Sequence, residues 1–108
     1  MTEQDIIQII ASAGTSKSIA FDALGCVKEG DYKQARELIE KARVADLEAH
    51  EVQTKLIQQE MASDVADREA LTLLVVHAQD HYMQAQLIRD LVAELIDVFE
   101  ALENRVKE

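Results

Sequence analysis

The residues from position 67 to position 106 contain neither glycine nor proline, and their apolar side chains recur at helical spacings. A helix over these residues would be about 60 Å long at roughly 1.5 Å per residue. The whole chain has 108 residues, the usual size of one domain, so we expect a single domain over residues 1–108. A lone three-helix bundle made from so short a chain cannot cover this helix, and we therefore expect self-association.

Two more helical patterns precede the long one. The first covers residues 3–29 and ends before Gly30, which suits the C′ position, while Asp31 suits the N-cap of the next helix, with Gln34 in the capping-box position. The second pattern covers residues 32–61 and keeps an alanine-rich heptad seam: Ala35, Leu38, Ala42, Ala45, Ala49, Val52 and Leu56. Because small side chains let helix axes approach closely, these two helices should pack antiparallel. The sequence predicts an all-α, antiparallel three-helix subunit.

A short loop at residues 62–67 should lead into the third helix. One broad face of that helix is mostly apolar, but His77, Asp80, His81 and Gln84 interrupt it. The whole face consists of Ala70, Leu73, Leu74, His77, Asp80, His81, Gln84, Ile88, Leu91, Leu95 and Leu102. The opposite, polar side includes Gln79. A polar cluster inside an apolar stripe needs a compensating partner, because burial of a charge or an imidazole is costly.

Charge and composition exclude several classes of function. The formal charge of −10 argues against binding to nucleic acid or to an anionic membrane and fits a partner with a basic face. Cys26 is the sole cysteine, so we expect a reduced, cytoplasmic setting in which Cys26 is a small core residue. We see no signal peptide and no stretch long enough to span a bilayer, and we expect no direct membrane insertion.

Three interpretations of the polar cluster remain open from the residues alone. His77, Asp80 and His81 can be satisfied by neighbouring side chains across an interface. His77 and His81 are four residues apart and can chelate one metal ion with Asp80 as a further ligand. Alternatively, one neutral imidazole can attack phosphorus and form a labile phosphoramidate. The chain has no ATP-binding motif, so the third interpretation requires a protein donor.

The second helical pattern also has a polar shoulder. Asp46, His50 and Gln53 follow one another at helical spacings beside the alanine seam and can face the cluster. A position in water at the rim of the bundle is the simpler expectation for each of them.

Two motifs resemble a known family, the enzyme IIA component of the lactose/cellobiose (chitobiose) class of the bacterial sugar phosphotransferase system. They are the segment His77-Ala78-Gln79-Asp80-His81-Tyr82-Met83 and the pattern Glu48-Ala49-His50, Gln53-Thr54 and Leu56. The likeness extends over nearly the whole chain, including the turn at Gly30. The family commonly has leucine at the position of Tyr82, and this change could alter contact with a partner more than the chemistry.

The resemblance implies a phosphotransferase component that uses a covalent phosphohistidine and no ATP. His77 would accept the phosphoryl group from the phosphocarrier protein HPr and pass it to a cysteine of the IIB component, for disaccharide uptake through the IIC permease. A homotrimer with a nine-helix bundle is implied, with Mg²⁺ or a similar ion at Asp80 on the axis. His81 would support His77, and Gln79 could contact a partner. The alternative is a non-enzymatic oligomerisation module with a structural divalent-metal site at His77, Asp80 and His81.

Overall fold

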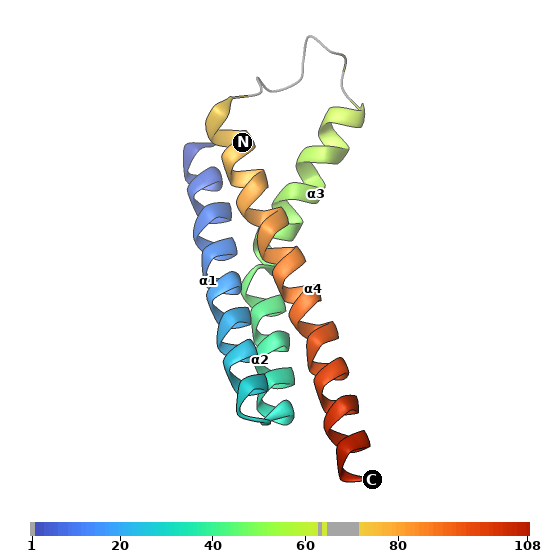
Figure 1. Ribbon diagram of the computed structural model, residues 1–108. Helices are drawn as coiled ribbons and strands as arrows, with labels where there is room; N and C mark the ends of the chain where they lie inside the picture. Colours follow the sequence, from blue (N-terminus) through green and yellow to red (C-terminus); the bar gives the residue numbers. More distant parts are fainter. Residues whose placement is uncertain (1, 63, 65–71) are drawn as a thin grey trace.

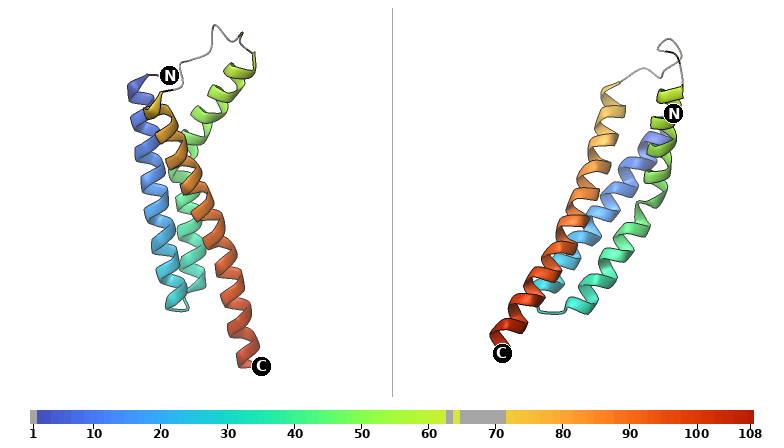
Figure 2. Two further views of the ribbon diagram at one scale, coloured as in Figure 1. Left: turned by 45° about the horizontal axis from the view of Figure 1, so that its top comes forward. Right: turned by 90° about the vertical axis from the view of Figure 1, so that its right-hand side faces the viewer.

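The computed structural model describes residues 2–62, 64 and 72–108, and these residues form helices and no strand. The helices are α1 (Glu3–Lys28), α2 (Tyr32–Ala45), α3 (Leu47–Ala62) and α4 (Leu73–Lys107). The molecule is elongated, 63 × 22 × 19 Å. α1 and α4 run in the same direction, and α2 followed by α3 runs antiparallel to both (Figures 1 and 2). The predicted all-α class is confirmed.

The turn between α1 and α2 forms as the sequence predicts. Gly30 has a φ of +78°, a left-handed conformation that glycine adopts without a steric penalty. The Gly30 amide donates to the Val27 carbonyl at 3.0 Å and the Asp31 amide to the Cys26 carbonyl at 2.9 Å, which is the Schellman pattern. The Asp31 carboxylate then accepts from the Gln34 amide at 3.1 Å and caps α2.

The second predicted helix is not continuous, which corrects the prediction of one helix over residues 32–61. Asp46 separates α2 from α3, with φ −106° and ψ 11°. The Asp46 side chain is buried, and its carboxylate accepts a hydrogen bond from the Arg89 guanidinium of α4 at 2.7 Å. Neither glycine nor proline causes this break, so the heptad spacing alone could not show it. Beyond the break, α3 diverges from α1 and α4 (Figure 1).

The third predicted helix begins later than expected. Thr72 has an extended backbone and is the N-cap of α4, and its side-chain oxygen accepts from the Val75 amide at 3.2 Å. The start predicted directly after residues 62–67 is therefore wrong. The predicted loop itself falls largely outside the described residues.

The core is built mainly from small and aliphatic side chains. Two buried clusters join α1 and α4, at the Ile6–Tyr82 end and the Val27–Ile96 end, and each includes an alanine of α2 or α3. On α4, the buried side chains are Ala78, Tyr82, Ala85, Val92 and Ile96. The broad apolar face predicted for this helix lies elsewhere, and most of its members are exposed. α4 therefore has two apolar seams, and a single subunit buries only the narrower, alanine-containing one.

Candidate functional site

His77 and His81 lie one turn apart on the outer surface of α4. His77 is exposed and His81 is half-buried. Their Nε2 atoms are 3.0 Å apart, and the rings meet edge-on with centroids at 4.5 Å and an interplanar angle of 87°. Since one nitrogen must donate and the other accept, one of the two Nε2 atoms carries a proton and the lone pair of the other accepts it. The structure therefore brings together the two imidazoles that the sequence predicts as nucleophile and support.

Asp80 is also exposed on α4, and it bonds within its own helix. Its Oδ2 accepts from the Gln84 amide nitrogen at 3.0 Å. Among the described residues, no group of three or more His, Cys, Asp or Glu side chains is placed to hold a metal ion. The Nε2 atoms of His77 and His81 point toward each other rather than toward a shared ion. The described part of one subunit therefore offers Asp80 alone, and a metal there would need carboxylates from other copies.

Gln79 does not lie on the polar side of α4, which corrects the sequence prediction. The side chain is half-buried against α3, where Oε1 accepts from the Gln53 amide nitrogen at 2.8 Å. The Gln79 Nε2 atom is buried and has no hydrogen-bond partner in the described part of the chain. Helical geometry places Gln79 about 160° around α4 from His77, so these two side chains face different sides of the subunit.

The predicted polar shoulder of Asp46, His50 and Gln53 faces α4. Besides the Gln53–Gln79 bond, the His50 Nδ1 atom lies 2.6 Å from the Tyr82 hydroxyl. We call the pairs Asp46–Arg89, His50–Tyr82 and Gln53–Gln79 the polar ladder. The expectation that the shoulder lies in water at the rim is wrong for Asp46, which is only 1% exposed. His50 remains exposed while its Nδ1 is bonded.

The Asp46–Arg89 pair has unusual electrostatics for the surface of a small bundle. The Nη1–Oδ1 distance is 2.7 Å, and the second carboxylate oxygen of Asp46 is buried without a partner in the described residues. Burial raises the pKa of the Asp46 carboxyl above its ordinary value, and the Arg89 guanidinium offsets this only in part. Arg89 was not singled out from the sequence. The sequence feature that could have indicated Arg89 is its position: a long, positively charged side chain stands on the buried seam of α4, between Ala85 and Val92.

Tyr82 has a different role from the one that the sequence suggested. Its side chain is only 2% exposed and lies in the core beside Ile9 and Ala78, so its ring is not on the surface available to a partner. Burial raises the pKa of the Tyr82 hydroxyl, so the hydroxyl keeps its proton, and its only hydrogen-bond partner among the described residues is the His50 Nδ1 atom. Where the family commonly has leucine, this chain thus gains a buried hydrogen bond between α4 and α3.

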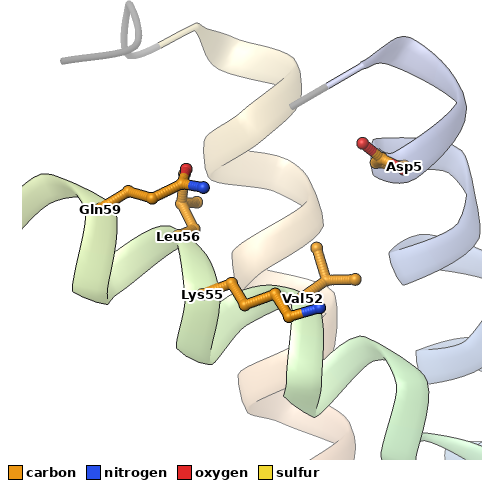
Figure 3. A pocket seen from close by; sticks show the side chains of 5 residues that line it. All are labelled: Asp5, Val52, Lys55, Leu56 and Gln59. Atoms are coloured by element: carbon orange, nitrogen blue, oxygen red, sulfur yellow. The ribbon is translucent and has the colours of Figure 1, made fainter. Parts of the chain in front are cut away.

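A cavity of about 270 Å³ lies apart from these residues, between the first turn of α1 and the outer half of α3 (Figure 3). Its lining mixes one acid, one base and two aliphatic side chains: Asp5, Val52, Lys55, Leu56 and Gln59. None of the sequence-predicted site residues lines this cavity, so it does not extend the candidate site. In the part of the chain that the structure describes, no helix is both long and apolar enough to cross a membrane.

Comparison with known proteins identifies the family. The profile of the family described as "PTS system, Lactose/Cellobiose specific IIA subunit" matches residues 4–100. The chain belongs to this family. The resemblance predicted from the two motifs is therefore confirmed, and the protein is a sugar-specific IIA component of a phosphotransferase system.

Curated relatives in this IIA family differ in the sugar that they are named for. The chain is 40% identical over 100 residues to the lichenan-specific phosphotransferase enzyme IIA component of Bacillus subtilis (strain 168), covering 93% of this chain and 88% of that protein. It is 38% identical over 100 residues to the N,N'-diacetylchitobiose-specific EIIA component of Escherichia coli (strain K12), covering 93% and 84%. Identities so similar to relatives named for different sugars do not assign a sugar to this IIA component.

Solved structures agree with the IIA assignment. The crystal structure of the PTS cellobiose specific enzyme IIA from Bacillus anthracis superposes with a TM-score of 0.83 at 40% identity, covering 96% of this chain and 94% of that one. A chain from the solution structures of the IIA(chitobiose)–HPr complex of Escherichia coli gives a TM-score of 0.77 at 37% identity, covering 94% and 95%. The second structure is that of a complex with HPr.

Proposed function

We propose that this IIA component carries a phosphoryl group on His77 in the cytoplasm. The group arrives from HPr and passes to a cysteine of the IIB component, and the IIC permease uses it for disaccharide uptake. Two findings support this proposal: membership of the IIA family, and the HPr complex of a relative 37% identical to this chain. The observation that carries the assignment to His77 is an exposed imidazole whose Nε2 is bonded to a second imidazole one helical turn away.

His81 is the supporting residue in this proposal. Nε2 is the ring nitrogen farther from the backbone, so we take Nε2 of His77 as the nucleophile. His81 then donates its Nε2 proton to that lone pair, which keeps the His77 proton on Nδ1. When phosphorus approaches, the P–N bond to HPr breaks as the P–N bond to His77 forms. The His81 N–H is then free to donate to a phosphoryl oxygen. No ATP takes part, and the protein contributes positioning and hydrogen-bond donors.

The active assembly in this proposal is a homotrimer with nine-helix packing, in which α2 and α3 of each chain together take the place of one long helix. Its support is an exposed stripe along one side of α4, which we call the α4 stripe. The stripe begins with two polar residues and continues with four apolar ones: Asp80, Gln84, Leu87, Leu91, Val98 and Leu102. Leu87 is 65% exposed and Leu91 50% exposed, on roughly the opposite side of α4 from the buried seam. Exposed apolar side chains aligned on one side of a helix mark an interaction surface.

Asp80 belongs to the α4 stripe, so a threefold axis along the stripe would gather three copies of its carboxylate. Like charges a few Å apart repel by several kcal/mol at an effective dielectric of about 20. A shared Mg²⁺ ion, or protons, would offset that repulsion, and carboxylate oxygens are suitable ligands for Mg²⁺. When bound, such an ion would supply positive charge at the axis. The transfer chemistry itself stays with His77 and His81.

A labelling experiment tests the carrier function. The protein is incubated with phosphoenolpyruvate, the general phosphotransferase enzyme and HPr, and intact mass is measured before and after acid treatment. We expect one acid-labile, base-stable phosphate per chain, and we expect His77→Gln to abolish it. His81→Gln should slow labelling without abolishing it. If His81→Gln removes the label while His77→Gln keeps it, the nucleophile is His81. Absence of any label from the wild-type protein would leave the structural metal module as the better reading.

A further inference from the structure

The phosphoryl group proposed for His77 needs more hydrogen-bond donors than one subunit provides. A phosphoryl group of this kind has a charge of roughly −2 and three acceptor oxygens. Among the described residues, the only side chain bonded to His77 is His81, and the exposed carboxylate of Asp80 follows within the same turn. The further donors are water, the docking partner or another copy of the chain.

We propose that His50 of a neighbouring subunit is a further catalytic residue, which donates its Nε2 proton to the phosphoryl group on His77. This inference rests on the proposed function. It assigns a role to the polar ladder, which the carrier chemistry within one subunit does not use. It also makes the site incomplete without a second copy.

The His50 ring is held in place on an exposed surface. The Tyr82 hydroxyl is buried and lies 2.6 Å from the His50 Nδ1 atom, its only hydrogen-bond partner among the described residues, so we assign the hydroxyl as the donor and Nδ1 as the acceptor. Thr54 donates its hydroxyl proton to the His50 carbonyl at 2.9 Å. A neutral imidazole that accepts at Nδ1 carries its proton on Nε2. Within the described residues, that Nε2 makes no hydrogen bond. His50 is therefore an oriented donor whose partner lies outside the described part of its own subunit.

His50 cannot serve the His77 of its own subunit. Gln79 marks the side of α4 that faces α3, because it bonds to Gln53 at 2.8 Å. His77 points about 160° away from Gln79 around the helix. The donor and the phosphoryl site thus lie on two different sides of one subunit. This is the arrangement that a head-to-tail ring of identical subunits requires.

The side of the subunit with His50 and the side with His77 lie at the same height along the bundle axis. The bonds His50–Tyr82 and Gln53–Gln79 place the first half of α3 beside the turn of α4 that holds the histidine pair. Rotation about an axis parallel to α4 leaves the level of every residue unchanged. The His50 of a neighbour therefore arrives at the level of His77 and His81.

The α3 surface around His50 suits a second copy of the chain. Three large apolar side chains on the same side of α3 are exposed, at one-turn to three-turn spacings from His50: Leu47, Ile57 and Met61. On α4, the exposed Val76 and Met83 continue this apolar surface toward the α4 stripe. This surface would accordingly be covered by the His77 side of the neighbouring subunit.

The transfer step balances with His50 as a donor only. The lone pair of His77 Nε2 forms the new P–N bond, and the electrons of the broken P–N bond return to the HPr imidazole. His50 keeps its proton and shares it with a phosphoryl oxygen. Its removal should lower the rate of labelling of His77 by roughly 10-fold or more, compared with ~10²–10³ for a donor in a sealed oxyanion hole.

Mixed trimers test whether His50 acts between subunits. His50→Ala subunits retain His77, and His77→Gln subunits retain His50. We dissociate and reassemble His50→Ala chains with a large excess of His77→Gln chains, and measure the initial rate of labelling per intact His77. Rescue toward the wild-type rate is expected, because each intact His77 then has a neighbour with His50. A rate equal to that of the His50→Ala homotrimer would overturn the proposal.

Control variants separate chemistry from folding. Glu48→Ala, on another side of α3, should label at the wild-type rate. His50→Gln retains N–H donors and should label faster than His50→Ala, whereas a purely structural role predicts equal rates. A cross-linking test in a Cys26→Ser background adds a geometric measurement. Because two imidazoles that share a phosphoryl group stand too far apart at their Cα atoms for a disulfide, the pair His50→Cys and His81→Cys is treated with a short bifunctional thiol reagent. The reagent should link separate chains on a denaturing gel, and absence of linked chains would contradict the arrangement.

The outcome also distinguishes this inference from the carrier function. If the wild-type chain takes up phosphate on His77 and sediments as a trimer, the proposed function stands. A His50→Ala variant that then labels at the wild-type rate refutes only the contribution of His50. If the wild-type chain takes up no phosphate, the proposed function itself fails and the mixed-trimer rates are all zero.

Discussion

The Asp46–Arg89 pair joins the break between α2 and α3 to α4. A buried carboxylate is tolerated only with a partner, and here one oxygen is bonded to Arg89 while the other has no partner in the described residues. The pair lies where α2 ends and α3 begins, so it fixes the break against α4. An Asp at this position costs free energy through burial, and the position of α3 depends on its partner.

Replacing Arg89 with leucine should therefore destabilise the fold in a pH-dependent way. Loss of the partner leaves a buried unpaired charge, which typically costs about 3–5 kcal/mol. The folded-state pKa of Asp46 is already above its ordinary value, and without Arg89 it should rise further. A raised carboxyl pKa contributes stability below the unfolded value of 3.8, and that stability is lost as pH rises through the folded value. Urea unfolding should show a small loss near about pH 4 and the full loss near about pH 7.

The double variant Asp46→Leu/Arg89→Leu is the matched control. With both charged groups removed, the destabilisation should be much smaller than for Arg89→Leu alone, and its pH dependence should disappear. An Arg89→Leu variant equally destabilised at both pH values would show that lost packing of the arginine stem, rather than the charge of Asp46, determines the effect.

At the scale of helices, the α1–α2 turn depends on one backbone conformation. Gly30→Ala should cost about 1 kcal/mol, because a residue with a Cβ is strained at a φ of +78°. The space beside it is not the problem, since an added Cβ would meet only Glu103 at 3.9 Å. Gly30→Asn should recover part of the loss. Thermal unfolding measures both, and Gly25→Ala, in a helical conformation with nothing within 4 Å, should be neutral or stabilising.

Helix propensities and local turn signals were enough to predict α1, the Gly30 turn and the existence of the long helix. The break at Asp46 was missed because its cause is a contact between residues 43 positions apart in sequence, and the heptad seam continues through it. The close approach of His77 and His81 follows from the sequence because residues four apart meet on any helix. The polar ladder was predicted only in part, since its α4 members Tyr82 and Arg89 are spaced like core residues.

The sequence predicts the wrong apolar seam of α4 as the buried one, for a physical reason. The leucine-rich side has more hydrophobic surface, and sequence patterns favour it as the buried one. In the subunit, however, α1 and α4 approach closely where the small Ala78 and Ala85 lie, and these residues are fully buried. A single sequence does not indicate which of two apolar seams packs within a subunit and which packs between subunits.

At the scale of the whole molecule, the α4 stripe should be the main contact of the assembly. Leu91→Asp would place a charge at a position that is 50% exposed in the subunit and that the proposed trimer would cover in each copy. Burying such an unpaired charge costs several kcal/mol per chain, so the trimer should dissociate at micromolar concentration. Analytical ultracentrifugation measures the change. Lys41→Asp, on an exposed position of α2, is the control and should leave the trimer intact.

Asp80 already places a charge on the α4 stripe, so its removal should have the opposite effect on the stability of the trimer. Asp80→Leu removes the mutual repulsion of three carboxylates and should leave the trimer intact or tighten it, by up to several kcal/mol at an effective dielectric of about 20. Mg²⁺ should raise the melting temperature of the wild-type trimer and have no effect on Asp80→Leu, because the ligand is then absent. Since His77 lies about 60° from Asp80 around the helix, labelling of His77 should persist in this variant. Dissociation of Asp80→Leu into monomers would show that Asp80 lies at a solvated edge of the interface, away from the axis.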